Sequence, residues 1–359
     1  MTNAYALIMA GGAGTRLWPL SRENRPKPLI KLVDRERSMF QIAVERLDPL
    51  FPPERVLVVA NATLTPQLQE QAPAIPPENF IVEPSGRNTA PAIGLAAVHL
   101  LHRDPEAVLA VLTADHYIQD EARFREVLGA AVEVAASGGI VTLGIEPDYP
   151  ATGFGYIERG ALARTVNGVD VYTLKQFREK PDEATAERYV ASGQYSWNSG
   201  MFIWQAARVM AEFEQHAPDI YTSLTQIRSS VGEARYNEVL HEVWPTIRKI
   251  SIDYAVMEHA DTDVFVIPVE MGWSDIGSFD ALYDILSASG EPVARPDSTI
   301  MVDTTSTLVM SDKLVATIGL EDVVIIETDD ALLVCRRDRA QDVKQIVERL
   351  KKENRDRYL

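Results

Sequence analysis

The first half of the chain alternates short apolar runs with longer amphipathic segments. The apolar runs, which we expect to be strands, are Ala4–Ala10, Val56–Asn61, Asn79–Val82, Val108–Thr113 and Gly139–Ile145. The amphipathic segments, which we expect to be helices, are Ser38–Leu47, Thr63–Gln71, Thr89–His102 and Glu121–Ser137. Strands that alternate with helices at this spacing predict an α/β fold with a mostly parallel sheet. Ligands of such sheets bind at the carboxyl ends of the strands, so functional residues are expected directly after these runs.

The pattern changes twice further along the chain. From Gly153 to about Leu286 we expect strands mixed with helices; examples are the strands Tyr172–Arg178 and Gly200–Trp204 and the helices Asp182–Ser192 and Ala206–His216. After Pro292, short β segments predict a small all-β coil or sandwich; they are Leu308–Met310, Leu314–Ile318, Val323–Glu327 and Leu332–Cys335. A charged amphipathic helix is expected from about Ala340 to Glu353. We therefore predict two domains, residues 1–290 and residues 291–359.

Composition narrows the range of partners. The 359 residues carry a net charge of −17, which disfavours non-specific binding to nucleic acid or anionic lipid. No apolar run approaches the ~20 residues of a membrane span, and the N-terminus lacks the basic segment of a signal peptide. The one cysteine, Cys335, allows no intrachain disulfide and is typical of a reducing compartment. We expect a cytoplasmic protein that binds neither nucleic acid nor membrane.

Basic residues gather near the N-terminus. Residues 1–37 hold seven basic and three acidic side chains, a local net charge of +4 in an acidic protein. The basic ones are Arg16, Arg22, Arg25, Lys27, Lys31, Arg35 and Arg37. A solvated basic loop would explain most clusters of this kind. Here the cluster directly follows a glycine-rich turn, which favours a small polyanionic ligand.

The glycine-rich turn after the first expected strand matches neither common phosphate-binding loop. A dinucleotide-binding turn has the pattern G-x-G-x-x-G and opens a helix. Gly12 and Gly14 supply two glycines, but Leu17 occupies the third position. Three prolines between residues 19 and 28 also exclude a long helix. A Walker A loop needs Gly-Lys-Ser/Thr, which is absent from this turn.

The turn and the proline-rich segment after it can still bind phosphate. Backbone amides near Gly11–Thr15 can approach anionic oxygens closely, because glycine has no side chain. Lys27 stands between Pro26 and Pro28, which fix the path of its backbone. A cation held so rigidly suits the charge that develops on a transferred phosphate. The alternative is a tight turn with basic residues on the surface.

Nine motifs follow one another over residues 5–280. They are AGGAGTRLWPLS (Ala10–Ser21), RPKP (Arg25–Pro28), EPSGRNTAPAI (Glu83–Ile93), TADH (Thr113–His116), TGFGYIE (Thr152–Glu158), FREKP (Phe177–Pro181), WNSGMF (Trp197–Phe202), SIDYAVME (Ser251–Glu258) and GWSDIGS (Gly272–Ser278). In this order they resemble the nucleotidyltransferases that join sugar 1-phosphates to nucleotides, and most of all the members that use GTP and mannose 1-phosphate. IGLEDVVIIET (Ile318–Thr328) resembles the C-terminal β region of that family.

The resemblance implies a fold and a reaction. The fold would be a Rossmann-like, mixed and mostly parallel sheet with helices on both faces, followed by a small β-helix-like domain. The reaction would be transfer of GMP from GTP to mannose 1-phosphate, giving GDP-mannose and pyrophosphate by in-line attack on the α-phosphate. Two alternatives stay open: the same chemistry on another sugar 1-phosphate or NTP, and a catalytically silent subunit that binds nucleotide sugars. The family also implies a homodimer. Some members carry a fused isomerase domain, but we expect no isomerase activity here.

The resemblance also assigns residues to the nucleotide. Nucleotide-binding candidates are Ala10, Gly11, Gly12, Gly14, Thr15, Asn88, Thr89 and Asp115. The catalytic candidates are Arg16, which would help to hold the GTP phosphates, and Lys27, which would neutralise charge on the α-phosphate and the leaving pyrophosphate. Many members read Pro-Lys-Gln-Phe where this chain reads Pro-Lys-Pro-Leu, so the lysine is kept and the glutamine is lost. As a simpler role, Asn88 or Thr89 is expected to cap the helix that follows.

Two aspartates and a second polar group complete the assignment. Asp115 follows the run Val108–Thr113, and Asp275 precedes a helix expected at Ser278. Each alone is also explained as a cap or turn residue. The resemblance implies that both bind Mg²⁺ between the phosphates of the two substrates, and Mg²⁺ does favour one or two carboxylates plus phosphate oxygens. The candidates for binding the sugar phosphate are Gly153, Glu179, Lys180 and Asn198. A solvated strand end is the simpler explanation of the Glu-Lys pair.

Overall fold

The structure is a computed structural model that describes residues 3–12, 14–291, 293–294 and 296–359. Its residues pack into two compact units. Unit 1 contains the chain up to Ala10 together with Val44–Ala114 and Ile118–Trp273, and unit 2 contains Gly11–Ala43, Asp115–Tyr117 and Ser274–Leu359. Each unit is described by itself. The domain boundary expected between residues 290 and 291 remains a prediction.

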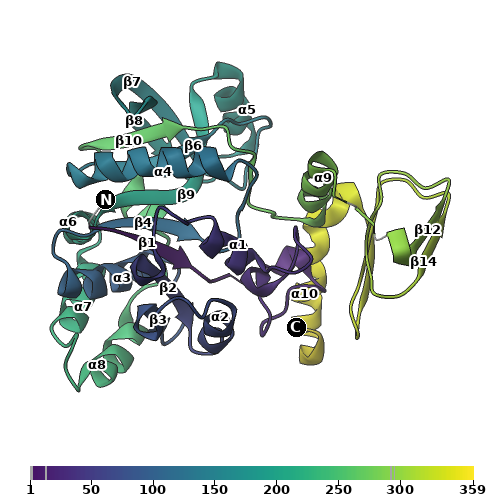
Figure 1. The fold of residues 1–359 in the computed structure, drawn as a ribbon, viewed down its shortest axis with the longest axis horizontal. Coiled ribbons are helices and arrows are strands. Elements are labelled where there is room, and N and C mark those ends of the chain that lie inside the picture. Colours follow the sequence, from purple (N-terminus) through teal and green to yellow (C-terminus); the bar gives the residue numbers. More distant parts are fainter. Residues whose placement is uncertain (1–2, 13, 292, 295) are drawn as a thin grey trace. The chain divides into compact units, whose positions relative to one another are not determined.

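Unit 1 is built on a mixed sheet. Nine strands of the described chain form this sheet, in the order β3-β2-β1-β4-β9-β6-β10-β8-β7 (Figure 1). The strands are β1 (Ala4–Met9), β2 (Val56–Asn61), β3 (Phe80–Glu83), β4 (Val108–Thr113), β6 (Ile140–Ile145), β7 (Tyr156–Val166), β8 (Val169–Arg178), β9 (Tyr195–Gln205) and β10 (Val264–Pro268). Two further short strands are β5 (Tyr117–Ile118) and β11 (Trp273–Ser274). The predicted α/β fold is therefore confirmed.

Parallel pairing aligns the ends of the first strands. β1 pairs in parallel with β2 and with β4, so that Met9 lies opposite both Val59 and Thr113. β6 and β10 are also parallel, whereas β9 runs antiparallel between β4 and β6. Because the ends of β1 and β4 are in register, the glycine turn and Asp115 each follow strand ends that lie side by side.

Ten α-helices lie in the described residues. They are α1 (Met39–Glu45), α2 (Thr65–Gln71), α3 (Thr89–Arg103), α4 (Glu121–Ala136), α5 (Glu183–Ser192), α6 (Ala206–His216), α7 (Pro218–Arg228), α8 (Tyr236–Val243), α9 (Phe279–Ser289) and α10 (Val343–Lys352). Short 3-10 and π turns are η1 (Thr15–Leu17), η2 (Lys27–Leu29), η3 (Pro53–Arg55), η4 (Pro77–Asn79), η5 (Trp244–Thr246), η6 (Asp253–Met257), η7 (Pro296–Ser298), η8 (Arg337–Asp342) and η9 (Asp356–Tyr358). None of the helices described has the length and apolar content that a membrane span needs.

Side-chain caps fix where several helices begin. The hydroxyl of Ser38 accepts a bond from Gln41 N, and the Gln41 side chain accepts one from Ser38 N, which is a capping box before α1. Asp120 and Asp182 are simple N-caps of α4 and α5, because the side chain of each accepts one bond from a main-chain amide of its helix. The predicted helix from Ala340 begins instead at Val343, because Arg337–Asp342 form the 3-10 turn η8.

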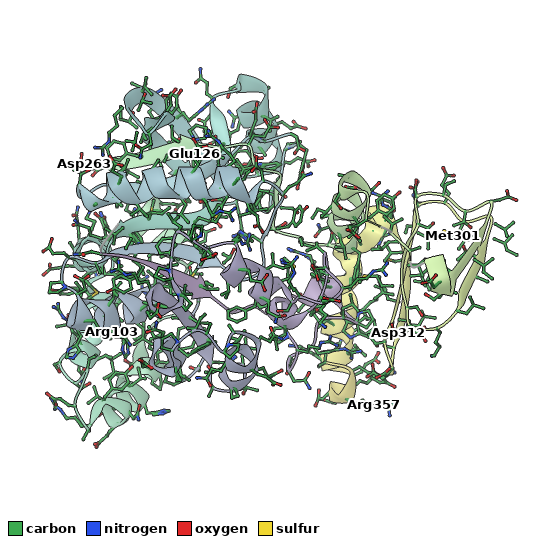
Figure 2. The ribbon with its side chains drawn as sticks, viewed as in Figure 1. Arg103, Glu126, Asp263, Met301, Asp312 and Arg357 are labelled. Carbon is green, nitrogen blue, oxygen red and sulfur yellow. The ribbon has the colours of Figure 1, made fainter. Side chains whose placement is uncertain are left out.

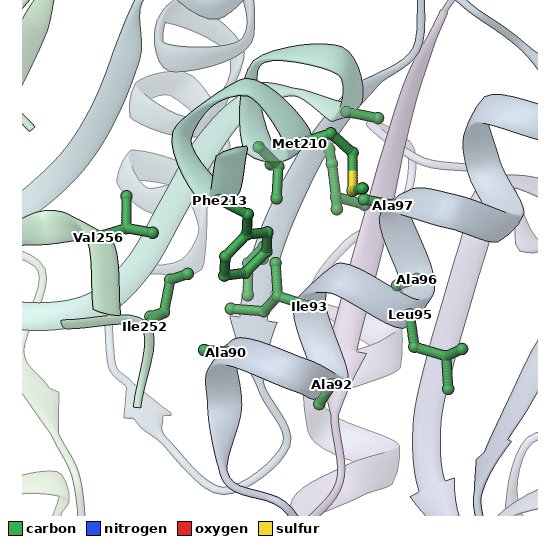
Figure 3. Close-up of a cluster of buried hydrophobic side chains, with 14 of the residues drawn as sticks. Ala90, Ala92, Ile93, Leu95, Ala96, Ala97, Met210, Phe213, Ile252 and Val256 are labelled. Atoms are coloured by element: carbon green, nitrogen blue, oxygen red, sulfur yellow. The ribbon is translucent and has the colours of Figure 1, made fainter. Parts of the chain in front are cut away.

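The core of unit 1 joins α3, α6 and α7 to one face of the sheet, and α4 lies along β6 and β9 on the other (Figure 1). Figure 3 shows Phe213 of α6, Ile93 of α3 and Ile252 within one cluster of buried side chains. A Cβ atom at Gly94 would lie 2.3 Å from a methyl carbon of Leu224. Glycine is therefore what lets α3 and α7 approach each other.

Unit 2 contains a parallel β coil. The strands of the coil are β12 (Thr299–Val302), β13 (Leu308–Met310), β14 (Val315–Ile318) and β15 (Val323–Glu327), and β16 (Leu332–Arg336) pairs antiparallel with β15. β12 pairs in parallel with β14 and β13 with β15, and each residue pairs with the one 16 positions later, as Leu308 does with Val324. This register is a coil rather than a sandwich, which confirms the predicted β-helix-like region. Met301, labelled on β12 in Figure 2, belongs to an exposed apolar strip with Ile300, Val302 and Ile318.

Candidate active site

The glycine turn approaches Lys27 closely. Gly12 and Gly14 have φ angles of 102° and 55°, which favour glycine. A Cβ atom at Gly14 would lie 3.0 Å from the Cβ atom of Lys27. The carbonyl oxygen of Gly14 accepts bonds from Ser21 Oγ (2.6 Å) and Leu17 N (2.8 Å). The turn is thus folded back on the segment that carries the lysine.

Lys27 is held between the two predicted metal ligands. It begins η2 between Pro26 and Pro28, and only 5% of its surface is exposed. Its Nζ atom donates to Asp115 Oδ2 at 3.0 Å and also to the main-chain oxygen of Asp275. The structure therefore brings together three residues that the sequence predicted for the site. We call them the Lys27 cluster: Lys27, Asp115 and Asp275.

The two carboxylates of the Lys27 cluster have different proton affinities. Burial opposes ionisation of Asp115, but the charges of Lys27 and His116, together with hydrogen bonds, outweigh burial and lower the pKa of Asp115. Burial raises the pKa of Asp275, and the negative charge of Asp115 raises it further, against the attraction of Lys27 and Arg16. One lysine thus balances a pair of neighbouring carboxylates, a combination that suits an additional cation.

The basic residues near the N-terminus have separate places in unit 2. Arg16 is exposed on η1, and its charge reaches Asp275. Arg22 binds the C-terminal segment through Tyr358 O. Four others line a different cavity of about 820 Å³; they are Arg25, Lys31, Arg35 and Arg37. The polyanionic ligand predicted for the whole cluster remains a prediction.

A second polar group lies in unit 1 around Asn198. The Nδ2 atom of Asn198 donates to Asp253 Oδ1 at 3.0 Å. Its Oδ1 atom accepts bonds from Gly200 N (3.0 Å) and Thr142 Oγ1 (3.3 Å). Both ends of the amide are therefore engaged, which fixes its orientation on β9.

Glu179 and Lys180 belong to the same polar group. Only 7% of the Glu179 surface is exposed, and its Oε2 atom has no hydrogen-bond partner among the described residues. Its Oε1 atom accepts a bond from Lys180 Nζ. Burial and then the charge of Asp253 raise the pKa of Glu179. A Cβ atom at Gly155 would lie 2.5 Å from Glu179 Oε2, so a glycine is needed opposite the carboxylate.

The simpler explanation of the Glu-Lys pair does not fit these contacts. A solvated strand end would leave the glutamate exposed, whereas Glu179 is buried. Lys180 also adopts a φ of 43°, a conformation that residues with side chains rarely take outside functional sites and turns. Gly153 is exposed, with open space where a Cβ atom would be. Its role in binding the sugar phosphate remains a prediction.

Sequence reasoning missed Asp253 as a member of this group. The residue lies in the motif SIDYAVME, and the π turn η6 (Asp253–Met257) carries it to Asn198. Burial raises the pKa of Asp253. Glu258, at the end of the same motif, accepts a bond from Glu179 N at 3.1 Å. Two acidic residues within an otherwise apolar segment were the available signal.

The start of α3 is tied to the same segment. Asn88 caps α3 by accepting a bond from Thr89 N at 2.8 Å, which confirms the capping role expected at this position. The Thr89 hydroxyl accepts a bond from Ile252 N at 2.8 Å. Because Asp253 follows Ile252, the nucleotide-binding candidate Thr89 is hydrogen-bonded to the segment that carries Asp253 to Asn198.

The loop before α3 is fixed by hydrogen bonds, and it begins with Glu83, a carboxylate whose pKa is raised. Trp244 Nε1 donates to Ser85 O at 2.7 Å, and the Arg87 guanidinium donates to Ile247 O at 3.0 Å. The Oε2 atom of Glu83, at the end of β3, is buried without a hydrogen-bond partner among the described residues. Burial raises the pKa of Glu83 to about 7.

Two features are typical of α/β proteins that bind phosphorylated ligands: parallel strands followed along the chain by a glycine turn, and a buried lysine that donates to two aspartates. Residues 5–291 match the family model described as Nucleotidyl transferase, and residues 297–350 match the one described as MannoseP isomerase/GMP-like beta-helix domain. The chain belongs to the nucleotidyl transferase family.

Named relatives match nearly all of the chain. The Mannose-1-phosphate guanylyltransferase of Escherichia coli (strain K12) is 39% identical over 360 residues, which cover 99% of this chain and 75% of that protein. The Xanthan biosynthesis protein XanB of Xanthomonas campestris pv. campestris (strain B100) is also 39% identical, with the same coverage of both chains. The resemblance found from the nine motifs is confirmed.

Solved structures share the fold. A crystal structure from Thermus thermophilus, described as mannose-1-phosphate geranyltransferase, is 36% identical and has a TM-score of 0.84, with 97% of this chain and 99% of that one covered. A mannose-6-phosphate isomerase structure from Helicobacter pylori is 28% identical and has a TM-score of 0.60, with 76% and 99% covered. The likeness extends over both units of the chain in the first of these.

Proposed function

We propose that this protein is a mannose-1-phosphate guanylyltransferase. It transfers GMP from GTP to mannose 1-phosphate and gives GDP-mannose and pyrophosphate. The relatives named for this reaction support the assignment, since they match almost the full chain. The observation that carries it is the Lys27 cluster, because a buried ammonium between two aspartates suits phosphoryl chemistry rather than a structural turn.

The donor set of the Lys27 cluster fits a divalent cation. Asp115 and Asp275 are close enough for the charge of Asp115 to raise the pKa of Asp275. Carboxylate pairs of this kind, completed by phosphate oxygens and water, suit Mg²⁺. In our proposal these two residues hold Mg²⁺, which when bound neutralises phosphate charge and aligns the two substrates.

Lys27 and the glycine turn prepare the α-phosphate for attack. The backbone amides of Gly11, Gly12, Gly14 and Thr15 bind the phosphate oxygens of GTP, and the buried residue Ala10 precedes them. Lys27 neutralises the charge that builds on the α-phosphate and on the leaving pyrophosphate. Arg16, exposed on η1, binds the phosphates of the incoming GTP. No covalent intermediate is needed, because the sugar phosphate oxygen itself attacks.

The Asn198 group binds the sugar phosphate. The Oε2 atom of Glu179, which has no hydrogen-bond partner in the described part of the chain, can accept bonds from sugar hydroxyls, and Asn198 is oriented by Asp253. Lys180 pairs with the 1-phosphate after leaving Glu179, since more than half of its side chain is exposed (54%). Asn88, Thr89 and the backbone beside them bind guanine, which offers both donors and an acceptor at its edge.

A substrate panel tests the function. Initial rates of pyrophosphate release are measured with Mg²⁺ for GTP, ATP, UTP and dTTP, each against mannose 1-phosphate and glucose 1-phosphate. We expect the highest kcat/KM for GTP with mannose 1-phosphate. A preference for another pair of substrates would change the substrate assignment. Binding of GDP-mannose without any release of pyrophosphate would favour a catalytically silent subunit. A separate assay that measures isomerisation of mannose 6-phosphate checks the expectation of no isomerase activity.

The remaining proposals concern the oligomeric state and the cellular location of the protein. We propose a homodimer, which the exposed apolar strip on β12 and β14 supports, and sedimentation velocity measures it directly. We propose a cytoplasmic location, which the lone cysteine supports. Relatives are longer than this chain, which covers about three quarters of their length.

A further inference from the structure

The segment between the glycine turn and Lys27 is fastened to the C-terminal end of the described chain. Trp18 Nε1 donates to the main-chain oxygen of Tyr358 at 2.7 Å. The Arg22 guanidinium donates to the same oxygen. One carbonyl thus receives two side chains from a loop 336 or more positions away in the sequence.

Arg22 makes further bonds that leave its side chain little freedom. Its Nε atom donates to Pro19 O at 2.8 Å, and its Nη2 atom donates to Asp330 Oδ1 at 2.7 Å and to Thr328 Oγ1 at 3.3 Å. The side chain is only 12% exposed, although Asp330 is 47% exposed. A guanidinium has five donors in a fixed plane, and here the three nitrogens are used on three different segments.

The backbone of Arg22 is connected to Lys27 by a short, stiff path. Arg22 and Arg25 exchange two main-chain bonds of 3.0 and 3.1 Å. Arg25 is followed by Pro26, Lys27 and Pro28, and the prolines restrict φ on both sides of the lysine. Ser21, on the other side of Arg22, is bonded to Gly14 in the glycine turn. A displacement of Arg22 is therefore passed to both Lys27 and the turn.

Contacts beside Arg22 strengthen the same attachment. Lys351 Nζ, on α10, lies 2.9 Å from a carboxylate oxygen of Glu23. Trp18 is buried, and it packs in one cluster with Val347 and Leu350 of α10. Arg357, labelled in Figure 2, lies next to Tyr358 in this C-terminal segment.

We propose that Arg22 is a positioning residue for Lys27, held in place by the carbonyl of Tyr358 and by the turn at residues 328–330. The C-terminal part of unit 2 then contributes to turnover by fixing the loop that carries the catalytic lysine. This inference rests on the proposed function. A purely structural role for Arg22 would also make these bonds, but it would affect stability without acting through Lys27.

The first experiment compares Arg22→Met with the wild-type protein. We expect kcat for GDP-mannose synthesis to fall roughly 10- to 100-fold, the scale for a small misplacement of a catalytic group. We expect KM for both substrates to stay within about threefold, because no substrate contact is removed. Arg22→Lys should recover part of the loss, since it keeps the positive charge and one of the three donor nitrogens. The control is Arg336→Met, which removes an exposed ion pair with Asp338 in the same unit.

A double variant separates positioning from structure. If Arg22 acts through Lys27, adding Arg22→Met to Lys27→Ala should lower kcat by less than about twofold. Equal losses in both backgrounds, or an unchanged kcat in Arg22→Met, would overturn the proposal. If Arg22→Met does not fold, Trp18→Phe takes its place, because it removes one donor to Tyr358 and keeps a buried ring. An unchanged kcat in Trp18→Phe, or an equal loss of kcat with and without Lys27→Ala, would then overturn the proposal. If the wild-type protein releases no pyrophosphate in the substrate panel, the proposed function has failed instead.

Discussion

Replacing Glu83 with glutamine tests the electrostatics at the end of β3. Burial raises the pKa of this carboxyl from 4.5 to about 7, and the backbone amide of Arg87 only partly opposes the shift. The Oε2 atom is buried and without a partner among the described residues, so its negative charge is poorly compensated. The folded protein therefore prefers Glu83 in its protonated form.

The sign and size of the effect follow from proton uptake. Between pH 4.5 and pH 7 the folded protein keeps a proton that the unfolded chain releases. Stability from this group is fully present below about pH 4.5 and is lost as the pH rises through 7. At about 1.4 kcal/mol per pKa unit, the wild-type protein loses about 2 kcal/mol of unfolding free energy through Glu83 between ~pH 5 and ~pH 8.

Glu83→Gln removes this titration. Urea unfolding of both proteins at a series of pH values gives the difference in unfolding free energy, which should move by about 2 kcal/mol in favour of the variant from ~pH 5 to ~pH 8. A constant penalty for the new amide shifts all points equally and leaves the slope unchanged. The control is Glu78→Gln, which replaces an exposed glutamate before the same strand. A difference that stays flat within about 0.5 kcal/mol over this range would refute the reasoning.

Three further variants test the two polar groups. Lys27→Ala should lower kcat by about 100-fold or more, because a preorganised charge is lost, and a loss below about threefold in steady-state rates would make the lysine peripheral. Gly155→Ala places a Cβ atom 2.5 Å from the present position of Glu179 Oε2, so KM for mannose 1-phosphate should rise while KM for GTP stays unchanged; a rise in both would argue against a sugar site. Asp275→Asn should raise the Mg²⁺ concentration for half-maximal activity by about tenfold or more in a metal titration. An unaltered titration curve would remove Asp275 from the metal site.

Local sequence patterns predicted the elements that depend on interactions between neighbouring residues. β2, β4 and α6 have the bounds expected from apolar periodicity, and the helix expected from Ser38 does begin after that residue, because these features involve neighbouring residues. β7 (Tyr156–Val166) was not predicted from its pattern, since half of the strand is exposed and lacks a clean alternation.

The sequence predicted most of the residues that belong to the sites, but not how these residues contact one another. Lys27 and Asp115 are 88 positions apart, and no periodicity joins them, so their contact is a property of the folded chain alone. Asp253 was missed because a π turn, rather than a regular helix, sets its direction. The Oε2 atoms of Glu83 and Glu179 have no hydrogen-bond partner among the residues that the structure describes, and this could not be foreseen either, because it is a property of the packed structure.

The 16-residue register of the β coil has a consequence for how this part of the chain can change in length. Leu308 and Val324 are stacked in the interior because each turn of the coil contains the same number of residues. One residue inserted between β13 and β15 would turn every later side chain to the opposite face and expose Val324. Inserting a whole turn would keep the stacking and lengthen the coil by one layer. Evolution of this region is thus expected to proceed in complete turns, while its exposed corners vary freely in residue type.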